Sequence, residues 1–91
     1  MHLELVYGAQ FKRDLRKMQK QNKPLVKLRC VIDKLAAKKK LEFKYKDHLL
    51  KGNYVGYREC HIEPDWLLIY KVVKERDLYL ARTGSHSELF K

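Results

Sequence analysis

Residues 57–70 decide the fold, and they read Tyr57-Arg58-Glu59-Cys60-His61-Ile62-Glu63-Pro64-Asp65-Trp66-Leu67-Leu68-Ile69-Tyr70. Turn-forming residues at Glu63-Pro64-Asp65 separate two runs of strand-forming residues, which predicts two β-strands joined by a tight turn. Side chains two positions apart on a strand share a face, so Glu59 and His61 should project side by side. This short stretch contains two carboxylates, an imidazole and an indole. Such groups suit proton transfer beside a stacked base better than they suit a hydrophobic core.

Length and composition limit the classes of protein to which the chain can belong. Ninety-one residues suit one small domain, which we place at 1–91, and a hydrophobic content of 45% is typical of a folded chain. The longest uninterrupted apolar run, residues 66–70, is far too short to span a membrane, and no segment resembles a signal peptide. We therefore expect a cytoplasmic protein in which Cys30 and Cys60 are small buried hydrophobic residues in a reducing compartment.

Positive charge is concentrated in the first half of the chain. The formal net charge is +10, and residues 1–51 contain 15 Lys and Arg against 5 Asp and Glu, whereas residues 52–91 contain 6 of each. This excess predicts a polyanionic partner, with one half of the chain holding the partner and the other half cutting it. An acidic protein or an anionic membrane would also explain the charge, although the predicted helices lack the broad aromatic face that suits a membrane surface.

The rest of the chain predicts further elements. Alternation of apolar and polar residues before Gly8 predicts a first strand over 2–7. Apolar residues at helical spacing predict two amphipathic helices within 9–39, separated by a break at Asn22-Lys23-Pro24. The basic run at 38–40 should end the second helix, where it complements the helix dipole or binds phosphate. After a loop at 41–51 and before a short tail at 85–91, strands are predicted over 54–62, 66–73 and 77–83.

Together these elements predict an α+β fold. An N-terminal strand and a two-helix hairpin should pack on a mostly antiparallel, four-stranded, twisted sheet, followed by the short tail. Residues 66–73 are apolar on both faces, which indicates the central strand. Because the helices cover one face, the other face should be the working surface, and it carries Glu59 and His61 if the apolar residues that alternate with them face the core. Arg58 then shares the core face, a conflict that the alternation does not explain.

Three of the four histidines, His48, His61 and His86, lie in motif-like segments. RNA is cut without a metal when a base removes the 2′-hydroxyl proton and an acid protonates the 5′-oxygen leaving group, and imidazole suits both tasks. A cation aimed at the phosphate would stabilise the transition state, a task that suits Lys46 or Arg82. Histidines from a loop, a strand and a tail would have to converge on one side of the sheet for this chemistry.

Each candidate also has a structural interpretation. Asp65 is of a type common in turns, Trp66 of a type common in cores, and Phe90 could either cover the edge of the core or stack on a base. A metal site would use the same histidines, cysteines and carboxylates, but the sequence has no Cys-x-x-Cys and no His-x-x-x-His spacing. Neither a metal nor any other cofactor is therefore expected.

Three motifs together carry a family resemblance. They are residues 57–70, the preceding Lys46-Asp47-His48-Xaa-Leu-Xaa-Gly52, and the following Arg82-Thr83-Gly84-Ser85-His86-Ser87-Glu88-Leu89-Phe90. Their combination resembles the YafQ-type branch of the RelE/ParE superfamily, which consists of small bacterial toxins of type II toxin–antitoxin pairs. The motifs cover roughly the second half of the chain, whereas the first half resembles the family only in layout.

The resemblance implies a RelE-like fold and an endoribonuclease that cleaves mRNA on the translating ribosome by metal-independent general acid–base catalysis. The family's catalytic and substrate-facing aromatic positions correspond to His48, Glu59, His61, Asp65, His86, Trp66 and Phe90. On this hypothesis His48 and Asp65 act on the 2′-hydroxyl, and His86 protonates the leaving group. His61, supported by Glu59, would orient or stabilise the phosphate.

The implied partners are mRNA on the ribosome and ribosomal RNA, which the basic helices would bind with an affinity that falls steeply with salt. The family also implies an acidic antitoxin that covers the site, and a toxin–antitoxin complex that binds operator DNA mainly through the antitoxin. No membrane partner is expected. Two other functions stay open: a ParE-like gyrase inhibitor of the same fold and a plain RNA-binding module. Neither needs three imidazoles with paired carboxylates.

Overall fold

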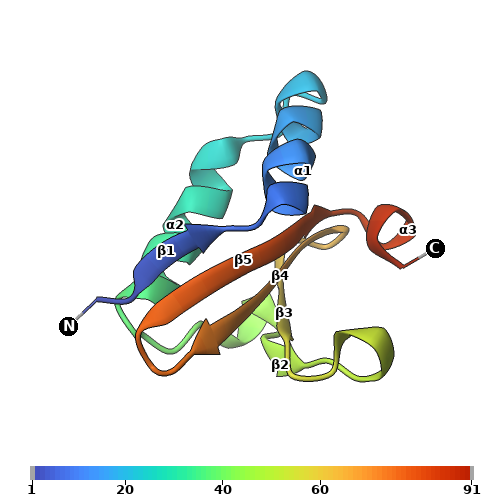
Figure 1. Ribbon diagram of the computed structural model, residues 1–91. Helices are drawn as coiled ribbons and strands as arrows, with labels where there is room; N and C mark the ends of the chain where they lie inside the picture. Colours follow the sequence, from blue (N-terminus) through green and yellow to red (C-terminus); the bar gives the residue numbers. More distant parts are fainter. Residues whose placement is uncertain (1, 91) are drawn as a thin grey trace.

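Two helices lie against one face of a five-stranded sheet in the computed structural model, which describes residues 2–90 (Figure 1). The elements in chain order are β1 (Glu4–Tyr7), α1 (Ala9–Lys20), α2 (Leu25–Ala36), η1 (Phe43–Tyr45), β2 (His48–Leu49), η2 (Gly52–Tyr54), β3 (Arg58–Glu63), β4 (Trp66–Val73), β5 (Asp77–Gly84) and α3 (His86–Leu89). The strand order is β1-β5-β4-β3-β2, in which β1 runs parallel to β5 and all other neighbours are antiparallel. Within the described residues no helix is long and apolar enough to cross a membrane.

The predicted α+β class, the N-terminal strand, the helix pair and the antiparallel meander are confirmed. β4 lies between β3 and β5, as its two apolar faces indicated. The second helix is shorter than predicted, because it begins at Leu25 after Pro24 and ends at Ala36. Lys38 has a left-handed backbone (φ 59°), which prevents the helix from continuing, so the whole basic run at 38–40 lies beyond it.

Two differences concern the segment before β3. The predicted number of strands was wrong by one, because His48 and Leu49 form β2, which pairs with β3 at the edge of the sheet. Two residues are too few to show an alternating pattern, so a lysine-rich loop was expected there. The strand predicted to begin at 54 begins at Arg58, since η2 and the positive φ of Gly56 (90°) interrupt the extended chain.

The main core lies between the helices and the sheet. Its fully buried side chains include Phe11, Met18, Val31, Leu68 and Leu78. They recur at helical spacing on α1 and α2 and at every second position on the strands, as the amphipathic patterns predicted. Removal of this apolar surface from water is the main force that holds the helices on the sheet.

A smaller apolar cluster lies on the opposite face of the sheet. Leu67, Ile69 and Leu89 are buried in it, and Tyr54 and Tyr57 pack against them. Residues of α3 and of the η2 segment therefore cover part of the face that we expected to be wholly a working surface. Its polar part lies where β2, β3 and α3 come together.

Arg58 and Asp47 resolve the conflict in the strand alternation. Arg58 lies on the helix-facing side of β3, and its Nε atom donates to Oδ1 of Asp47 at 3.2 Å. The Tyr70 hydroxyl donates to the same oxygen at 2.6 Å. Burial, and then the hydrogen bond to Asp47, raise the pKa of Tyr70, so the phenol keeps its proton. This network ties Asp47, which lies between Lys46 and β2, to strands β3 and β4.

Candidate active site

The predicted catalytic residues come from four segments that meet in one place. His48 lies on β2, directly opposite Glu59 of β3 in the strand register. Glu59 and His61 are two residues apart on β3, so the three side chains share the face away from the main core. Asp65 lies in the turn between β3 and β4, and His86 is the first residue of α3.

Glu59 lies between two imidazole rings. The residue is 4% exposed, and its Oε1 atom is 3.6 Å from Nε2 of His48 and 3.5 Å from Nε2 of His61. The Nδ1 atom of each ring faces a backbone carbonyl, that of Lys46 at 2.6 Å and that of Pro64 at 3.3 Å. A buried carboxylate is stable only when polar groups face it, and here the two imidazoles do so.

Asp65 holds His86 in two ways. Its Oδ1 atom accepts the backbone N–H of His86 at 3.0 Å and lies 3.1 Å from Nδ1 of the same residue. The backbone N–H, and then the ring, lower the pKa of Asp65, so this carboxyl is ionised at neutral pH. Because an ionised carboxylate only accepts hydrogen bonds, Nδ1 carries a proton, and in the neutral ring Nε2 is left to exchange a proton with a substrate.

The structure brings these two groups of residues together. The ring centroids of His61 and His86 are 5.8 Å apart, so imidazoles from the central part of the chain and from its tail lie side by side. The side chains of His48 and His86 are 50% and 55% exposed, whereas that of His61 is 16% exposed. Two accessible imidazoles therefore flank a less accessible pair, Glu59 and His61.

A capping box at the start of α3 positions His86. The Ser85 hydroxyl accepts the backbone N–H of Glu88, and the Glu88 Oε1 atom accepts the backbone N–H of Ser85 at 2.8 Å. The Oε2 atom of Glu88 lies 3.2 Å from Nζ of Lys17 on α1. The Ser85 N–H is the main cause that lowers the pKa of Glu88 to about 2, and the Lys17 ammonium adds to it. One short helical turn is thereby held to α1 and packed against β5.

Phe90 forms an aromatic border next to His86. Its ring centroid lies 6.1 Å from that of His86 and 5.7 Å from that of Tyr54, and the residue is 43% exposed. Phe90 thus covers part of the small apolar cluster and still offers an open ring surface. Tyr54 of η2 supports this border through its edge-on contact with Phe90.

Trp66 does not reach the open surface. It is 1% exposed, and its Nε1 atom donates to the Thr83 hydroxyl at 2.9 Å, which itself donates to the Leu67 carbonyl at 2.8 Å. The expected role of Trp66 as an aromatic contact for RNA does not fit this position, because the ring lies in the main core and its polar atom already has a partner. Trp66 is therefore a residue of the main core.

Arg82 forms an ion pair with a buried carboxylate. Its Nε and Nη2 atoms lie 2.8 Å and 3.3 Å from the two oxygens of Asp14 on α1, and Asp14 is 5% exposed. The hydrogen bond to Asp14 is the main cause that raises the pKa of Arg82. A role for Arg82 as a free phosphate cation therefore does not fit its contacts. Sequence reasoning missed Asp14, although its position three residues after Phe11 in an apolar stripe is a signal for a buried carboxylate.

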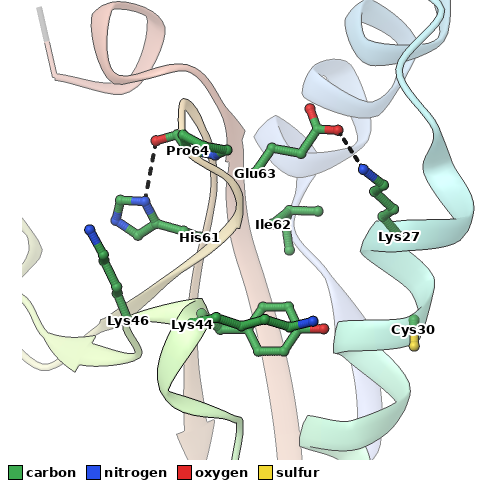
Figure 2. A pocket seen from close by; sticks show the side chains of 9 residues that line it. Lys27, Cys30, Lys44, Lys46, His61, Ile62, Glu63 and Pro64 are labelled. Carbon is green, nitrogen blue, oxygen red and sulfur yellow. Dashed lines mark hydrogen bonds and ion pairs between the residues drawn. The ribbon is translucent and has the colours of Figure 1, made fainter.

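Lys46 is the better placed of the two predicted cations. It follows η1 with a left-handed backbone (φ 49°), and Figure 2 shows its side chain directed toward the ring of His61. Within residues 2–90 its ammonium group forms no ion pair. Lys46 is therefore available to an anion that approaches His61.

Three of these residues also form a possible metal-binding group. Glu59, His61 and His86 each offer a ligand atom, and these atoms lie within 4.8 Å of one another. Two imidazoles and one carboxylate suit zinc, copper or iron. The sequence argument against a metal considered only ligands close together in the chain, whereas here strand β3 and the tail contribute them jointly.

Comparison with known proteins gives one consistent result. The family model described as the bacterial toxin of type II toxin–antitoxin system, YafQ, matches residues 3–91. The mRNA interferase toxin YafQ of Escherichia coli K12 is 40% identical over 88 residues, which cover 96% of this chain and 95% of that protein.

Two solved structures show the same fold. The toxin in the crystal structure of the E. coli DinJ-YafQ toxin–antitoxin complex is 38% identical and superimposes with a TM-score of 0.90 over 100% of both chains. A metal-bound toxin from Helicobacter pylori is 44% identical, with a TM-score of 0.90 over 97% of this chain and 99% of that one. The RelE-like fold implied by the sequence motifs is thus confirmed, and the chain belongs to the YafQ family of bacterial toxins of type II toxin–antitoxin systems.

Proposed function

We propose that this chain is an mRNA interferase, an endoribonuclease that cleaves mRNA during translation on the ribosome. The observation that carries the proposal is the cluster in which the Asp65–His86 pair lies beside His61 and Glu59. The name of the E. coli relative, mRNA interferase toxin, supports the same activity. Ribosomes are in the cytoplasm, so the proposal also places the protein there.

Cleavage requires two proton transfers around one phosphate. A base removes the 2′-hydroxyl proton, the 2′-oxygen attacks phosphorus, and the bond from phosphorus to the 5′-oxygen breaks as an acid protonates that oxygen. The products are a 2′,3′-cyclic phosphate and a 5′-hydroxyl. His48 and His86 are the two accessible imidazoles on either side of Glu59 and His61. In this proposal His48 accepts the 2′-hydroxyl proton, and His86 protonates the leaving oxygen through Nε2.

Asp65 is assigned to His86 on the basis of its contacts. The sequence-based hypothesis put Asp65 with His48 on the 2′-hydroxyl side, but its carboxylate contacts the backbone and the ring of His86. A carboxylate in that place fixes the ring orientation and the tautomer, which keeps Nε2 directed at the substrate. Its lowered pKa supports this positioning role, because it remains an acceptor throughout the cycle.

The phosphate is assigned to His61 and Lys46. Glu59 and the Pro64 carbonyl hold the His61 ring from both sides, and the Lys46 side chain is directed toward that ring. Positive charge or N–H donors fixed in this way stabilise the additional negative charge of the five-coordinate phosphorus. This scheme needs no metal, because side chains supply both the base and the acid.

The partners in this proposal are a cognate acidic antitoxin, the ribosome and its mRNA, and operator DNA bound only as the toxin–antitoxin complex. The structure of the DinJ-YafQ complex supports the antitoxin. Exposed lysines and arginines on α1 and α2 support contact with ribosomal RNA, because a dense positive surface gains affinity by releasing counterions. A ParE-like gyrase inhibitor or a simple RNA-binding module would leave the histidine–carboxylate cluster without a use.

Primer-extension mapping of a translated message tests the proposal. We expect cuts within the translated region when ribosomes are present, no comparable cuts when they are absent, and the same cuts after a chelator has been added. Cleavage of naked RNA at the same sites and rates would contradict ribosome dependence. Loss of cleavage in the chelator, with recovery after addition of a divalent metal, would contradict the metal-independent scheme and favour the Glu59–His61–His86 group as a metal site.

A further inference from the structure

A pocket of about 450 Å³ opens beside the candidate active site (Figure 2). It is lined by Lys27 and Cys30 of α2, by residues 44–46, and by residues 61–64 at the end of β3 and in the following turn. His61 belongs both to this pocket and to the catalytic cluster, so the two sites are continuous. Its volume falls in the range of roughly 300–1,000 Å³ that is usual for sites that bind small molecules.

The charge of the pocket suits a phosphate. Lys27 is paired with Glu63 at 2.9 Å, which leaves that carboxylate neutralised. Lys44 and Lys46 are exposed, and within residues 2–90 neither forms an ion pair. Two unpaired ammonium groups therefore face a cavity that has one, already neutralised, carboxylate on its wall.

Among the described residues, the pocket on the other side of the turn lacks unpaired lysines in its lining. It is smaller, about 290 Å³, and its lining contains the carboxylates of Glu63, Asp65 and Glu88 with Lys23 as the single cation. Lys23 is itself paired with Glu63 at 3.7 Å, and Glu88 is paired with Lys17. A nucleic-acid strand that leaves the catalytic cluster would therefore be attracted to the side of Lys44 and Lys46, where the unpaired ammonium groups lie. The direction of the strand is thereby suggested by charge alone.

Tyr45 gives the pocket a flat aromatic wall. The Nζ atoms of Lys34 and Lys44 lie 5.4 Å and 5.2 Å from its ring centroid. Lys44 is exposed, so its ammonium can move from the ring to a phosphate while a base takes its place on the ring. Stacking on an aromatic side chain is open to every base, because every base has a π-face.

We propose that this pocket is a subsite for one nucleotide of the RNA strand, the nucleotide next to the cleaved phosphodiester. Its base stacks on Tyr45, and its phosphate lies between the ammonium groups of Lys44 and Lys46. The inference rests on the proposed function for the identity of the substrate. It adds a binding site outside the histidine cluster and a direction in which the strand leaves that cluster.

Cys30 provides a test that does not depend on cleavage. It lines the pocket and is exposed, so the expectation that it would be buried was wrong, whereas Cys60, the second cysteine of the chain, is fully buried as expected. Burial also raises the pKa of Cys60, which makes its thiolate scarce. The modification rate of the protein by N-ethylmaleimide therefore reports on the occupancy of this pocket.

The probe is a single-stranded trinucleotide with methylated 2′-hydroxyls, which cannot be cleaved by attack of the 2′-oxygen. We expect saturating probe to slow the modification of Cys30 severalfold, and inorganic phosphate at the same ionic strength to have little effect. Lys44→Gln should weaken the protection and lower its dependence on log[salt] by about 0.7, the value for one phosphate contact on a single strand. Lys20→Gln removes the same charge from the exposed surface of α1 and should change neither quantity.

Tyr45 separates stacking from charge. Tyr45→Phe keeps the ring and should keep the protection, whereas Tyr45→Leu should reduce it, with circular dichroism to show that both variants are folded. A modification rate of Cys30 that is the same with and without saturating trinucleotide would overturn the subsite, even if the protein cleaves mRNA on ribosomes. Protection of Cys30 in a protein that fails to cleave mRNA would instead overturn the proposed function and leave the nucleotide-binding pocket in place.

Discussion

The carboxylate of Asp65 contacts His86 at two atoms, with one oxygen 3.0 Å from the backbone nitrogen and 3.1 Å from Nδ1 of the ring. These residues are far apart in the sequence, and the contact fixes the most exposed imidazole of the cluster at the end of α3.

Asp65→Asn should reduce cleavage without unfolding the protein. The amide oxygen can still accept the backbone N–H, but the neutral side chain no longer enforces the tautomer with a proton on Nδ1. Loss of one positioned acid or base typically costs about 10²–10⁴-fold in rate, and we expect the lower part of that range because His86 itself remains. Single-turnover cleavage of ribosome-bound mRNA measures the effect, and a rate equal to that of the unchanged protein would remove Asp65 from the mechanism.

Glu88 should make the stability of the protein depend on pH. Its pKa is about 2 in the folded state against an ordinary 4.5, so the capping box contributes its full stability above pH 4.5 and loses it as the pH falls toward 2. Glu88→Gln should therefore lower the free energy of unfolding by about 1 kcal/mol at neutral pH, and the difference should shrink in acid. Urea unfolding at several pH values measures this, with Glu75→Gln in the exposed β4–β5 turn as the control. If Glu88→Gln lowered the free energy of unfolding by the same amount at low pH as at neutral pH, the lowered pKa of Glu88 would be contradicted.

Trp66 should matter for stability and not for chemistry. Trp66→Phe removes part of a buried ring and leaves the Thr83 hydroxyl without its donor, which should cost about 1–3 kcal/mol. Because the ring does not face the cluster, the cleavage rate of the folded variant should stay unchanged. A strong loss of cleavage with little loss of stability would show that Trp66 contacts the RNA after all.

The Asp14–Arg82 pair should behave as a structural unit. Asp14→Asn leaves a half-buried guanidinium without its counter-charge, so it should lower the free energy of unfolding. Once Asp14→Asn is present, the further addition of Arg82→Gln should lower this free energy by less. The two substitutions should therefore show a coupling of about 0.5–3 kcal/mol in a double-mutant cycle. Additive effects on the urea midpoint would indicate that Arg82 acts elsewhere, including at the phosphate.

Much of the fold was readable from the chain because its patterns are local. Helical spacing of apolar residues located α1 and α2, and a strand with two apolar faces was placed at the centre of the sheet. Alternation also put Glu59 and His61 on one face, and β2 brings His48 opposite Glu59 in register. β2 itself was missed because a two-residue strand is defined by its partner and not by its own sequence.

The candidate site was less readable because its contacts are long-range. The partner of His86 is Asp65, 21 residues earlier, and the partner of Arg82 is Asp14, 68 residues earlier. Composition cannot show which cation is already paired with a carboxylate. From the sequence, Arg82 and Lys46 are therefore equal candidates for the cation that contacts the phosphate. For Trp66, alternation could not decide between the faces of a strand that is apolar on both sides.

The most direct test of this account is the single-turnover cleavage rate of ribosome-bound mRNA by His86→Ala, compared with His2→Ala, which changes a histidine remote from the cluster. The account predicts a loss of at least about 10²-fold for His86→Ala and an unchanged rate for His2→Ala. Equal rates for the two variants would show that the imidazole held by Asp65 takes no part in the reaction.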